Sequence, residues 1–281
     1  MSKKIALVLE GGGLRGAYTA GCISWLIDNN IKIDSAYGIS TGAWHLCGFL
    51  HKNSSLEKEL STKFINDKSN MGIKSILYGE GIFSFKNLLK QLTEKTAFDL
   101  DSIKNTNINA KVGLYNLKEE KTLYYPIKDI NMNHLVAACS LPLLSKVVCI
   151  GDDKFLDGGI TEMIPIKEAI NDNNDGYIVV TTKPSDFVRK PSNKFVVWLM
   201  KIVYSKYKSI GRDYDVRDKN YYDQIDIIKK LEVEKKAIYR YPSKHSDVTR
   251  LKGTYEELVD LYNLGYKDME DSKERILDLC K

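Results

Sequence analysis

The sequence predicts an α/β fold with three layers, α/β/α, in which a mainly parallel central sheet lies between two layers of helices. The first observation is a short, fully apolar run at Ile5–Leu9, which indicates a strand buried on both faces. The second is a helical pattern at 14–29, which follows a run of glycines. The third is that this order repeats, with a strand pattern at 33–39 and a helical pattern at 41–51. Strands that alternate with helices form parallel sheets with right-handed crossovers.

The rest of the first 185 residues continues this pattern. A short helix is predicted at 132–139, and 54–105 reads as mostly helical and irregular, with polar faces. Further strand patterns occur at 109–115, 122–126, 147–150, 155–156 and 176–182.

The composition changes after Pro184. Residues 194–281 show long helical periodicity, abundant Tyr and Lys, and few strand signals. We therefore predict an α/β domain at 1–185 and a mainly helical C-terminal extension at 186–281 that packs on it. A chain of 281 residues can bury a substantial core without disulfides or metals.

The net charge of +5 is unevenly distributed. Residues 1–185 carry 21 basic and 20 acidic side chains, whereas 186–281 carry 21 and 17. The stretch 189–212 alone holds seven basic residues and no acidic one. A net charge this small does not indicate a nucleic-acid partner. The excess of basic over acidic residues is local to this one segment.

The cysteines indicate reduced thiols in a cytoplasmic protein, because they are odd in number and form no Cys-x-x-Cys pair. They are Cys22, Cys47, Cys139, Cys149 and Cys280. The first apolar run ends at Glu10 after five residues, so we expect a strand there and not a signal peptide. No His, Cys, Asp or Glu cluster has the spacing of metal ligands, and we expect neither a metal nor a cofactor.

The first motif that could carry chemistry is Gly11-Gly12-Gly13-Leu14-Arg15-Gly16, between a predicted strand and a predicted helix. Glycines at such a junction let backbone N–H groups point into open space, and the helix adds positive charge at its N-terminus. The loop is therefore suited to a negative group. Its spacing fits the Gly-x-Gly-x-x-Gly dinucleotide fingerprint, and it would serve equally as an oxyanion hole for acyl transfer.

The second motif is Gly38-Ile39-Ser40-Thr41-Gly42, at the next strand-to-helix junction. It has the Gly-x-Ser-x-Gly pattern of a nucleophile elbow, in which a cramped turn exposes the serine hydroxyl. An ordinary turn between a strand and a helix is the alternative for this pentapeptide.

The third motif is Asp157-Gly158-Gly159, which follows the strand pattern at 155–156. Asp-Gly alone is a common turn pair. Loops at the carboxyl ends of neighbouring parallel strands converge on one crevice, however. An anion hole, a serine on an elbow and a carboxylate together make a complete set of groups for acyl transfer.

In this order the three motifs resemble those of the patatin-like phospholipase family. Ala137-Ala138-Cys139-Ser140-Leu141-Pro142 and Pro165-Ile166 are also similar to segments of that family, and the likeness covers about residues 4–182. Tyr262-x-x-Gly265-Tyr266 in the tail further resembles a bacterial branch. The resemblance implies a patatin-like fold, with a catalytic domain at 1–185.

The resemblance also implies a Ser–Asp dyad without histidine, acting on lipid esters. Ser40 would be the nucleophile and Asp157 the base that takes its proton. The oxyanion hole would come from the glycine loop, assisted by Arg15, and we assign it Gly11, Gly12, Gly13 and Arg15. The supporting motif glycines are Gly16, Gly38, Gly42, Gly158 and Gly159. Trp44, where small or polar residues are more usual in such families, departs from the pattern and puts acyl-chain preference in doubt.

Three alternatives remain open. An α/β-hydrolase triad would read Ser40, Asp157 and His245, but such a sheet usually needs more strands before its elbow. A dinucleotide site would want an acidic residue at the end of the second strand, where Ser40 stands instead. The third is a catalytically weak protein that binds lipids or acyl groups on the same scaffold.

The basic segment at 194–212 combines an apolar body with Trp, Tyr and Lys. Apolar contact together with attraction to anionic headgroups is how a peripheral enzyme binds a membrane surface, which here would be the inner one. The alternative is a buried helix with snorkelling lysines, and the unbroken apolar run at 195–200 fits that alternative better.

Overall fold

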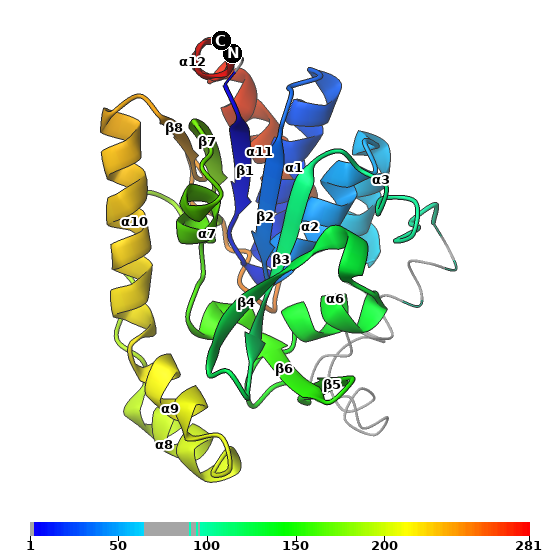
Figure 1. Cartoon of the computed structure of the whole chain (residues 1–281). Coiled ribbons are helices and arrows are strands. Elements are labelled where there is room, and N and C mark those ends of the chain that lie inside the picture. The colour runs from blue at the N-terminus through cyan, green and yellow to red at the C-terminus, as the bar shows by residue number, and fades with distance from the viewer. Residues whose placement is uncertain (1–2, 65–89, 91–93, 95) are drawn as a thin grey trace.

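A computed structural model describes residues 3–64, 90, 94 and 96–281, and Figure 1 shows one continuous sheet covered by helices. The eight strands pair in the order β5-β6-β3-β2-β1-β7-β8, with β4 on β3. They are β1 Ile5–Leu9, β2 Ser35–Ile39, β3 Asn109–Asn116, β4 Lys121–Pro126, β5 Val148–Ile150, β6 Asp153–Asp157, β7 Gly176–Val180 and β8 Ala237–Arg240.

The sheet is parallel through its centre and antiparallel at one end. β1 pairs in parallel with β2 and β7, β2 with β3, and β7 with β8. β3 pairs antiparallel with β4 and β6, and β6 with β5. The predicted α/β class with a mainly parallel sheet is confirmed.

Alternate residues of β1 build two separate cores, which is why its whole sequence is apolar. Ile5, Leu7 and Leu9 belong to the larger core, while Ala6 and Val8 belong to the core on the opposite face. Helices that contribute to the larger core are α1 Gly16–Asp28, α2 Thr41–Leu50, α3 Ser54–Glu59, α6 Met132–Ala138, α11 Tyr255–Glu270 and α12 Lys273–Cys280. The opposite face is covered by α7 Ile166–Asn171 and α10 Arg217–Val233.

The part after residue 185 is built into the sheet as well as packed on it. Its strand β8 pairs with β7, which the sequence pattern did not predict. Four residues are too few to show a periodicity, and helical segments flank them on both sides. The division of the chain at 185 remains a proposal. Part of the segment at 54–105, expected to be mostly helical, lies outside the described residues.

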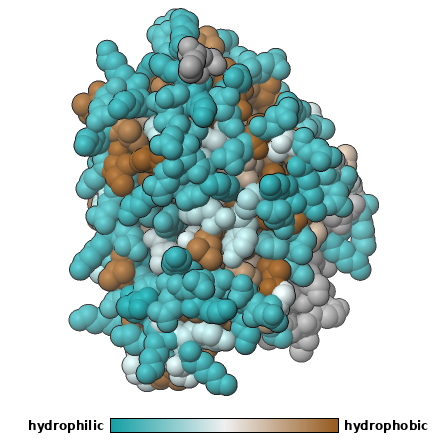
Figure 2. All heavy atoms as spheres, viewed as in Figure 1, coloured by the Kyte–Doolittle hydropathy of each residue, from teal (hydrophilic) through white to brown (hydrophobic). Residues whose placement is uncertain are grey.

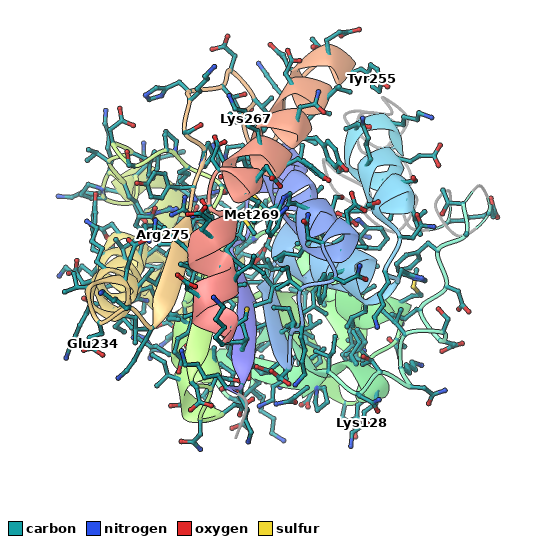
Figure 3. All side chains as sticks on the ribbon, turned by 90° about the horizontal axis from the view of Figure 1, so that it is seen from above. Lys128, Glu234, Tyr255, Lys267, Met269 and Arg275 are labelled. Carbon is teal, nitrogen blue, oxygen red and sulfur yellow. The ribbon has the colours of Figure 1, made fainter. Side chains whose placement is uncertain are left out.

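Helix α11 lies directly against α1, as the view from above shows (Figure 3). A Cβ atom added to Gly21 would lie 1.9 Å from the carbonyl oxygen of Tyr262, and one added to Gly265 would lie 2.2 Å from that of Tyr18. The two backbones therefore meet through glycines that no larger residue can replace without a shift. The Tyr18 hydroxyl also donates to Asp268 Oδ2 at 3.0 Å.

Helices α8 (Lys194–Val203) and α9 (Lys208–Asp215) lie together at one end of the molecule (Figure 1). Val197 and Met200 are the buried residues of α8, whereas Phe195 is 65% exposed and Trp198 is 54% exposed. The unbroken apolar run suggested burial on all sides, and that expectation is wrong because only one side of α8 packs on the core. On the face seen in Figure 2, by contrast, hydrophilic residues predominate and hydrophobic ones form scattered patches.

Candidate active site

Ser40 lies in the tight turn between β2 and α2, at the carboxyl end of the parallel strands. Its backbone has φ 56° and ψ −131°, which is a strained conformation for a residue with a side chain. The neighbouring strand β1 ends at Leu9, and Glu10 connects it to the glycine loop at the same edge of the sheet. The first two motifs are thus brought side by side.

Two amides of the glycine loop converge on one oxygen atom. The N–H groups of Gly12 and Gly13 donate to Thr41 Oγ1 at 3.0 and 3.1 Å. Gly13 has φ +60°, and a Cβ atom there would lie 2.3 Å from the carbonyl oxygen of Arg250. Two N–H groups aimed at one oxygen provide the geometry that stabilises a developing oxyanion. In this arrangement the Thr41 hydroxyl occupies that position.

The two other residues assigned to the oxyanion hole are placed differently. The Gly11 N–H donates to the carbonyl of Met163 at 3.3 Å, so this amide is engaged elsewhere. Arg15 does not line the pocket that contains Ser40. Its Nε is buried and has no hydrogen-bond partner among the described residues, and burial lowers the pKa of its guanidinium. Gly11 therefore lines the pocket with its amide directed away from Thr41 Oγ1, and Arg15 contributes no direct contact to this pocket.

Asp157 ends β6 and is 1% exposed. Its Oδ1 accepts the N–H of Gly159 at 2.7 Å, while Oδ2 is buried and accepts no hydrogen bond from any residue that the structure describes. Burial raises the pKa of this carboxyl, and four neighbours partly offset the rise: Ser40, Gly159, Arg217 and Arg250. A buried carboxylate with one oxygen unengaged beside a serine can accept a proton.

Ser40 and Asp157 line one small pocket of about 30 Å³ together with the glycine loop. Of the supporting motif glycines, Gly159 lines this pocket, and all five lie in close contact with neighbouring atoms. An added Cβ would lie within 3.0 Å of another atom at each of Gly16, Gly38, Gly42, Gly158 and Gly159. The segment at 137–142 is also adjacent, since the Asp157 N–H donates to the Ser140 carbonyl at 2.9 Å.

Two arginines that the motifs did not predict complete the pocket. Arg217, at the start of α10, is 8% exposed, and its Nε donates to the Gly159 carbonyl at 2.7 Å. The Arg250 carbonyl accepts the Leu14 N–H at 3.1 Å. Both arginines line the pocket with Ser40. A single arginine in a helical or loop segment carries no motif, so no local signal could have identified them.

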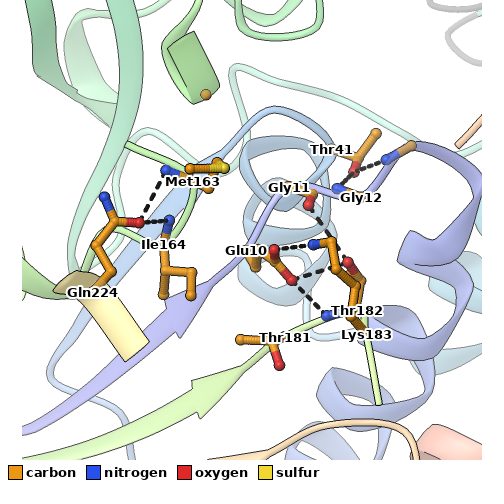
Figure 4. Close-up of polar contacts among 12 residues, drawn as sticks. Glu10, Gly11, Gly12, Thr41, Met163, Ile164, Thr181, Thr182, Lys183 and Gln224 are labelled. Atoms are coloured by element: carbon orange, nitrogen blue, oxygen red, sulfur yellow. Dashed lines mark hydrogen bonds and ion pairs between the residues drawn. The ribbon is translucent and has the colours of Figure 1, made fainter. Parts of the chain in front are cut away.

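A buried ion pair supports the glycine loop from below (Figure 4). Glu10 pairs with Lys183, and Glu10 Oε2 accepts the Thr182 N–H at 2.7 Å and its hydroxyl at 3.0 Å. Burial opposes ionisation of Glu10, but its partners outweigh this effect and lower its pKa, while burial lowers the pKa of Lys183 to about 8. Gln224 Oε1 accepts the N–H groups of Met163 and Ile164 at 3.2 and 2.9 Å on the other side.

All four histidines lie within the described residues, and none lines the pocket of Ser40 and Asp157. His245 is 76% exposed and pairs with Asp186 at 3.0 Å. His45 is buried against Glu57 at 2.5 Å. Trp44 is likewise buried, with its ring 4.7 Å from that of Phe98, and it does not line this pocket.

Two family models and two curated proteins are similar in sequence to this chain. A family model described as patatin-like phospholipase matches residues 7–170, and a second, described as a domain of unknown function (DUF6363), matches 207–281. The chain is 24% identical over 195 residues to the uncharacterized protein YjjU of Escherichia coli (strain K12), which covers 67% of this chain and 54% of that protein. It is 25% identical over 210 residues to the probable lipid hydrolase 463L of Invertebrate iridescent virus 6, which covers 63% and 69%.

Among solved structures, VipD from Legionella pneumophila shares the fold. The TM-score is 0.53 at 14% identity, and the match covers 100% of this chain and 67% of that one. The chain spans about half the length of the E. coli relative.

Proposed function

Since the chain belongs to the patatin-like phospholipase family, we propose that it is a serine acylhydrolase that cleaves acyl esters of lipids. The observation that carries this proposal is the placement of Ser40, on a strained elbow, in one pocket with the buried Asp157 and the paired amides of Gly12 and Gly13. The printed name of the viral relative, a probable lipid hydrolase, agrees with it.

In the proposed reaction, Ser40 Oγ attacks the carbonyl carbon of the ester while its proton passes to Asp157 Oδ2. The carbonyl oxygen becomes negatively charged and takes the place of the Thr41 hydroxyl on the two amides. The intermediate collapses to acyl-Ser40, and the alcohol leaves with the proton from Asp157. Water then attacks the acyl-Ser40 ester, giving its proton to Asp157, and the fatty acid is released as Ser40 recovers that proton.

An aspartate is a weak base because its reference pKa is about 3.9. Burial raises the pKa of Asp157, which brings it closer to the working pH and improves its ability to accept the serine proton. The alternative triad is less well supported, since His245 is exposed and paired with Asp186. The dyad is therefore the proposed catalytic unit.

We further propose that α8 and α9 bring the enzyme to a membrane surface on the cytoplasmic side. The outward side of α8 presents four exposed apolar residues, and Phe195 stacks on Trp198 with ring centroids 5.6 Å apart. These four are Phe195, Trp198, Ile202 and Val203. Exposed Lys201, Lys206 and Lys208 lie among or beside them and would attract anionic headgroups. No helix in the described part of the chain is long and apolar enough to cross a bilayer.

A catalytically weak lipid-binding protein is the second candidate. Two features favour it. The pocket is small, so a substrate has to widen it, and the Thr41 hydroxyl accepts from the two amides, so a substrate has to displace that hydroxyl. Turnover of a lipid ester distinguishes the two, because a binding protein would retain the ligand uncleaved.

The test is labelling with a fluorophosphonate, followed by mapping of the modified residue. We expect the label on Ser40 and its loss in Ser40→Ala, together with loss of ester hydrolysis. Ser102→Ala is the matched control, since Ser102 is an exposed serine outside the site. Labelling of another residue, or hydrolysis that survives Ser40→Ala, would contradict the proposal.

A further inference from the structure

A second pocket, of about 190 Å³, adjoins the one that contains Ser40. The two pockets share Arg217 and Arg250 as lining residues, and Arg189 lines only the second. Asn193 and Val196 from the start of α8 also line it. The second pocket therefore lies between the catalytic pocket and the helix proposed to contact the membrane.

The three arginines carry positive charge, and none of them forms an ion pair within the described part of the chain; Asp157 and Glu10 act on them only from a longer distance. Among the residues that the structure describes, no carboxylate oxygen lies within 4.0 Å of their guanidinium nitrogens. Arg212 and Arg275, in contrast, each form such a pair. Asp218 lines the second pocket but lies beyond this distance.

Aromatic rings hold two of these guanidinium groups in place without neutralising them. Arg189 lies 4.4 Å from the centroid of the Tyr221 ring, and Arg217 lies 4.6 Å from that of Tyr214. The Nε of Arg189 is buried and has no hydrogen-bond partner among the described residues. Burial, together with the charges of Arg250 and Arg189, lowers the pKa of Arg217 to about 10, although Tyr214 and Asp157 oppose this effect. A bound anion would relieve this repulsion.

We propose that the second pocket binds the phosphate of a lipid headgroup while the acyl ester of the same molecule lies at Ser40. Guanidinium groups bind the oxygens of a phosphate through paired hydrogen bonds. Three such groups supply more positive charge than an uncharged ester requires. This inference rests on the proposed hydrolase function and adds a substrate class to it: phosphate-bearing esters over neutral ones. Arg189 is its most specific residue, because it lines the second pocket and not the first.

The first experiment compares two esters with the same acyl chain, dodecanoyl glycerol 3-phosphate and monododecanoyl glycerol. We expect Arg189→Gln to lower kcat/KM for the phosphate-bearing ester by about 10- to 100-fold, mainly through KM. This loss should exceed the loss on the neutral ester at least tenfold. Arg189→Lys should restore part of the lost activity, because lysine keeps the positive charge but lacks the paired N–H donors of a guanidinium group. Lys219→Gln, on an exposed side chain of α10, is the matched control of equal charge change and should alter neither activity.

Equal losses on both esters would overturn the proposal, and so would a wild-type enzyme that shows no preference for the phosphate-bearing ester. A thermal melt of each variant, with a Tm near that of the wild type, ensures that an effect is not the result of misfolding.

A binding measurement separates this inference from the hydrolase proposal. Dodecyl glycerol 3-phosphate with an ether link in place of the ester cannot be cleaved, and calorimetry gives its Kd with or without turnover. We expect wild type and Ser40→Ala to bind it alike, and Arg189→Gln to bind it about tenfold or more weakly. Unchanged binding by Arg189→Gln would refute the phosphate pocket even if esters are hydrolysed. Binding without hydrolysis would refute only the hydrolase. Inorganic phosphate that binds as tightly as the ether lipid would overturn the assignment to a headgroup.

Discussion

The pocket that contains Ser40 has two sides, which come from different parts of the chain and are positioned in different ways. On one side are Ser40, Asp157 and the glycine loop, each held by a turn at the end of a strand. On the other are Arg217 and Arg250, which come from the part of the chain after residue 185. The first side depends on local backbone constraints, which leave motifs in the sequence. The second depends on where α10 and the loop after β8 pack, which leaves none.

The largest effect should come from the motif side, through Asp157→Asn. Loss of the general base should lower kcat for a lipid ester by about 10²- to 10⁴-fold. His245→Ala is the matched control and should be nearly silent, since His245 is exposed and outside the pocket. The reverse pattern, a silent Asp157→Asn and an inactive His245→Ala, would rule out the dyad in favour of the triad. Steady-state kinetics of both variants suffices.

The two sides meet where Gly13 touches Arg250, and Gly13→Ala should separate them. The added Cβ strains a backbone with φ +60° and presses on the Arg250 carbonyl, so the amides of the oxyanion hole should move. We expect kcat to fall by about 10²- to 10³-fold. Gly151→Ala is the control, because Gly151 has φ +59° but nothing within 4 Å of an added Cβ. If both variants lose activity equally, strain alone and not the contact would be responsible.

The segment after residue 185 can be tested apart from the pocket by reversing three charges near α8. Lys201→Glu, Lys206→Glu and Lys208→Glu together should weaken binding to anionic vesicles by at least roughly 100-fold. Loss of three lysine contributions of about 1 kcal/mol each accounts for that factor, and repulsion of the glutamates adds to it. The same reversal of Lys229, Lys230 and Lys235, which are exposed near the far end of α10 (Figure 1), should have much less effect. Vesicle sedimentation measures both. Equal binding by the two triple variants would rule out contact through α8.

The smallest effect concerns pH. The charge of Arg250 lowers the pKa of Asp157, so Arg250→Gln should raise that pKa further. Asp157 has to be ionised to accept a proton, and the acid limb of kcat/KM for a neutral ester should therefore move to higher pH. Arg275→Gln, which removes an exposed arginine paired with Glu232, should leave the limb in place. A limb that stays unmoved in Arg250→Gln would show that this arginine does not act on Asp157.

The sequence predicted a mainly parallel sheet and the turns that carry Ser40 and Asp157, because these follow from short-range rules. It expected the three loops to meet at the carboxyl ends of parallel strands, and this is wrong for Asp157, since β6 runs antiparallel to β3. An apolar run of five residues predicts a buried strand, and glycines flanking a serine predict a tight turn. β8 was missed because its register with β7 is set by tertiary contacts and not by its four residues. The exposure of Phe195 and Trp198 was missed for a related reason: an apolar helix does not indicate which of its sides finds a partner.

The Arg250 carbonyl on the Leu14 amide has a consequence for biosynthesis. Synthesis begins at the N-terminus, so Ser40 and Asp157 exist in the nascent chain well before residues 237–250 are made. Until then β7 has no β8 beside it, α1 is without α11, and the glycine loop has no acceptor for Leu14. We therefore expect a ribosome-bound chain to carry the whole motif set and yet remain inert. If the proposed function is correct, hydrolysis of lipid esters would begin only when the late segment has folded back onto the first strands.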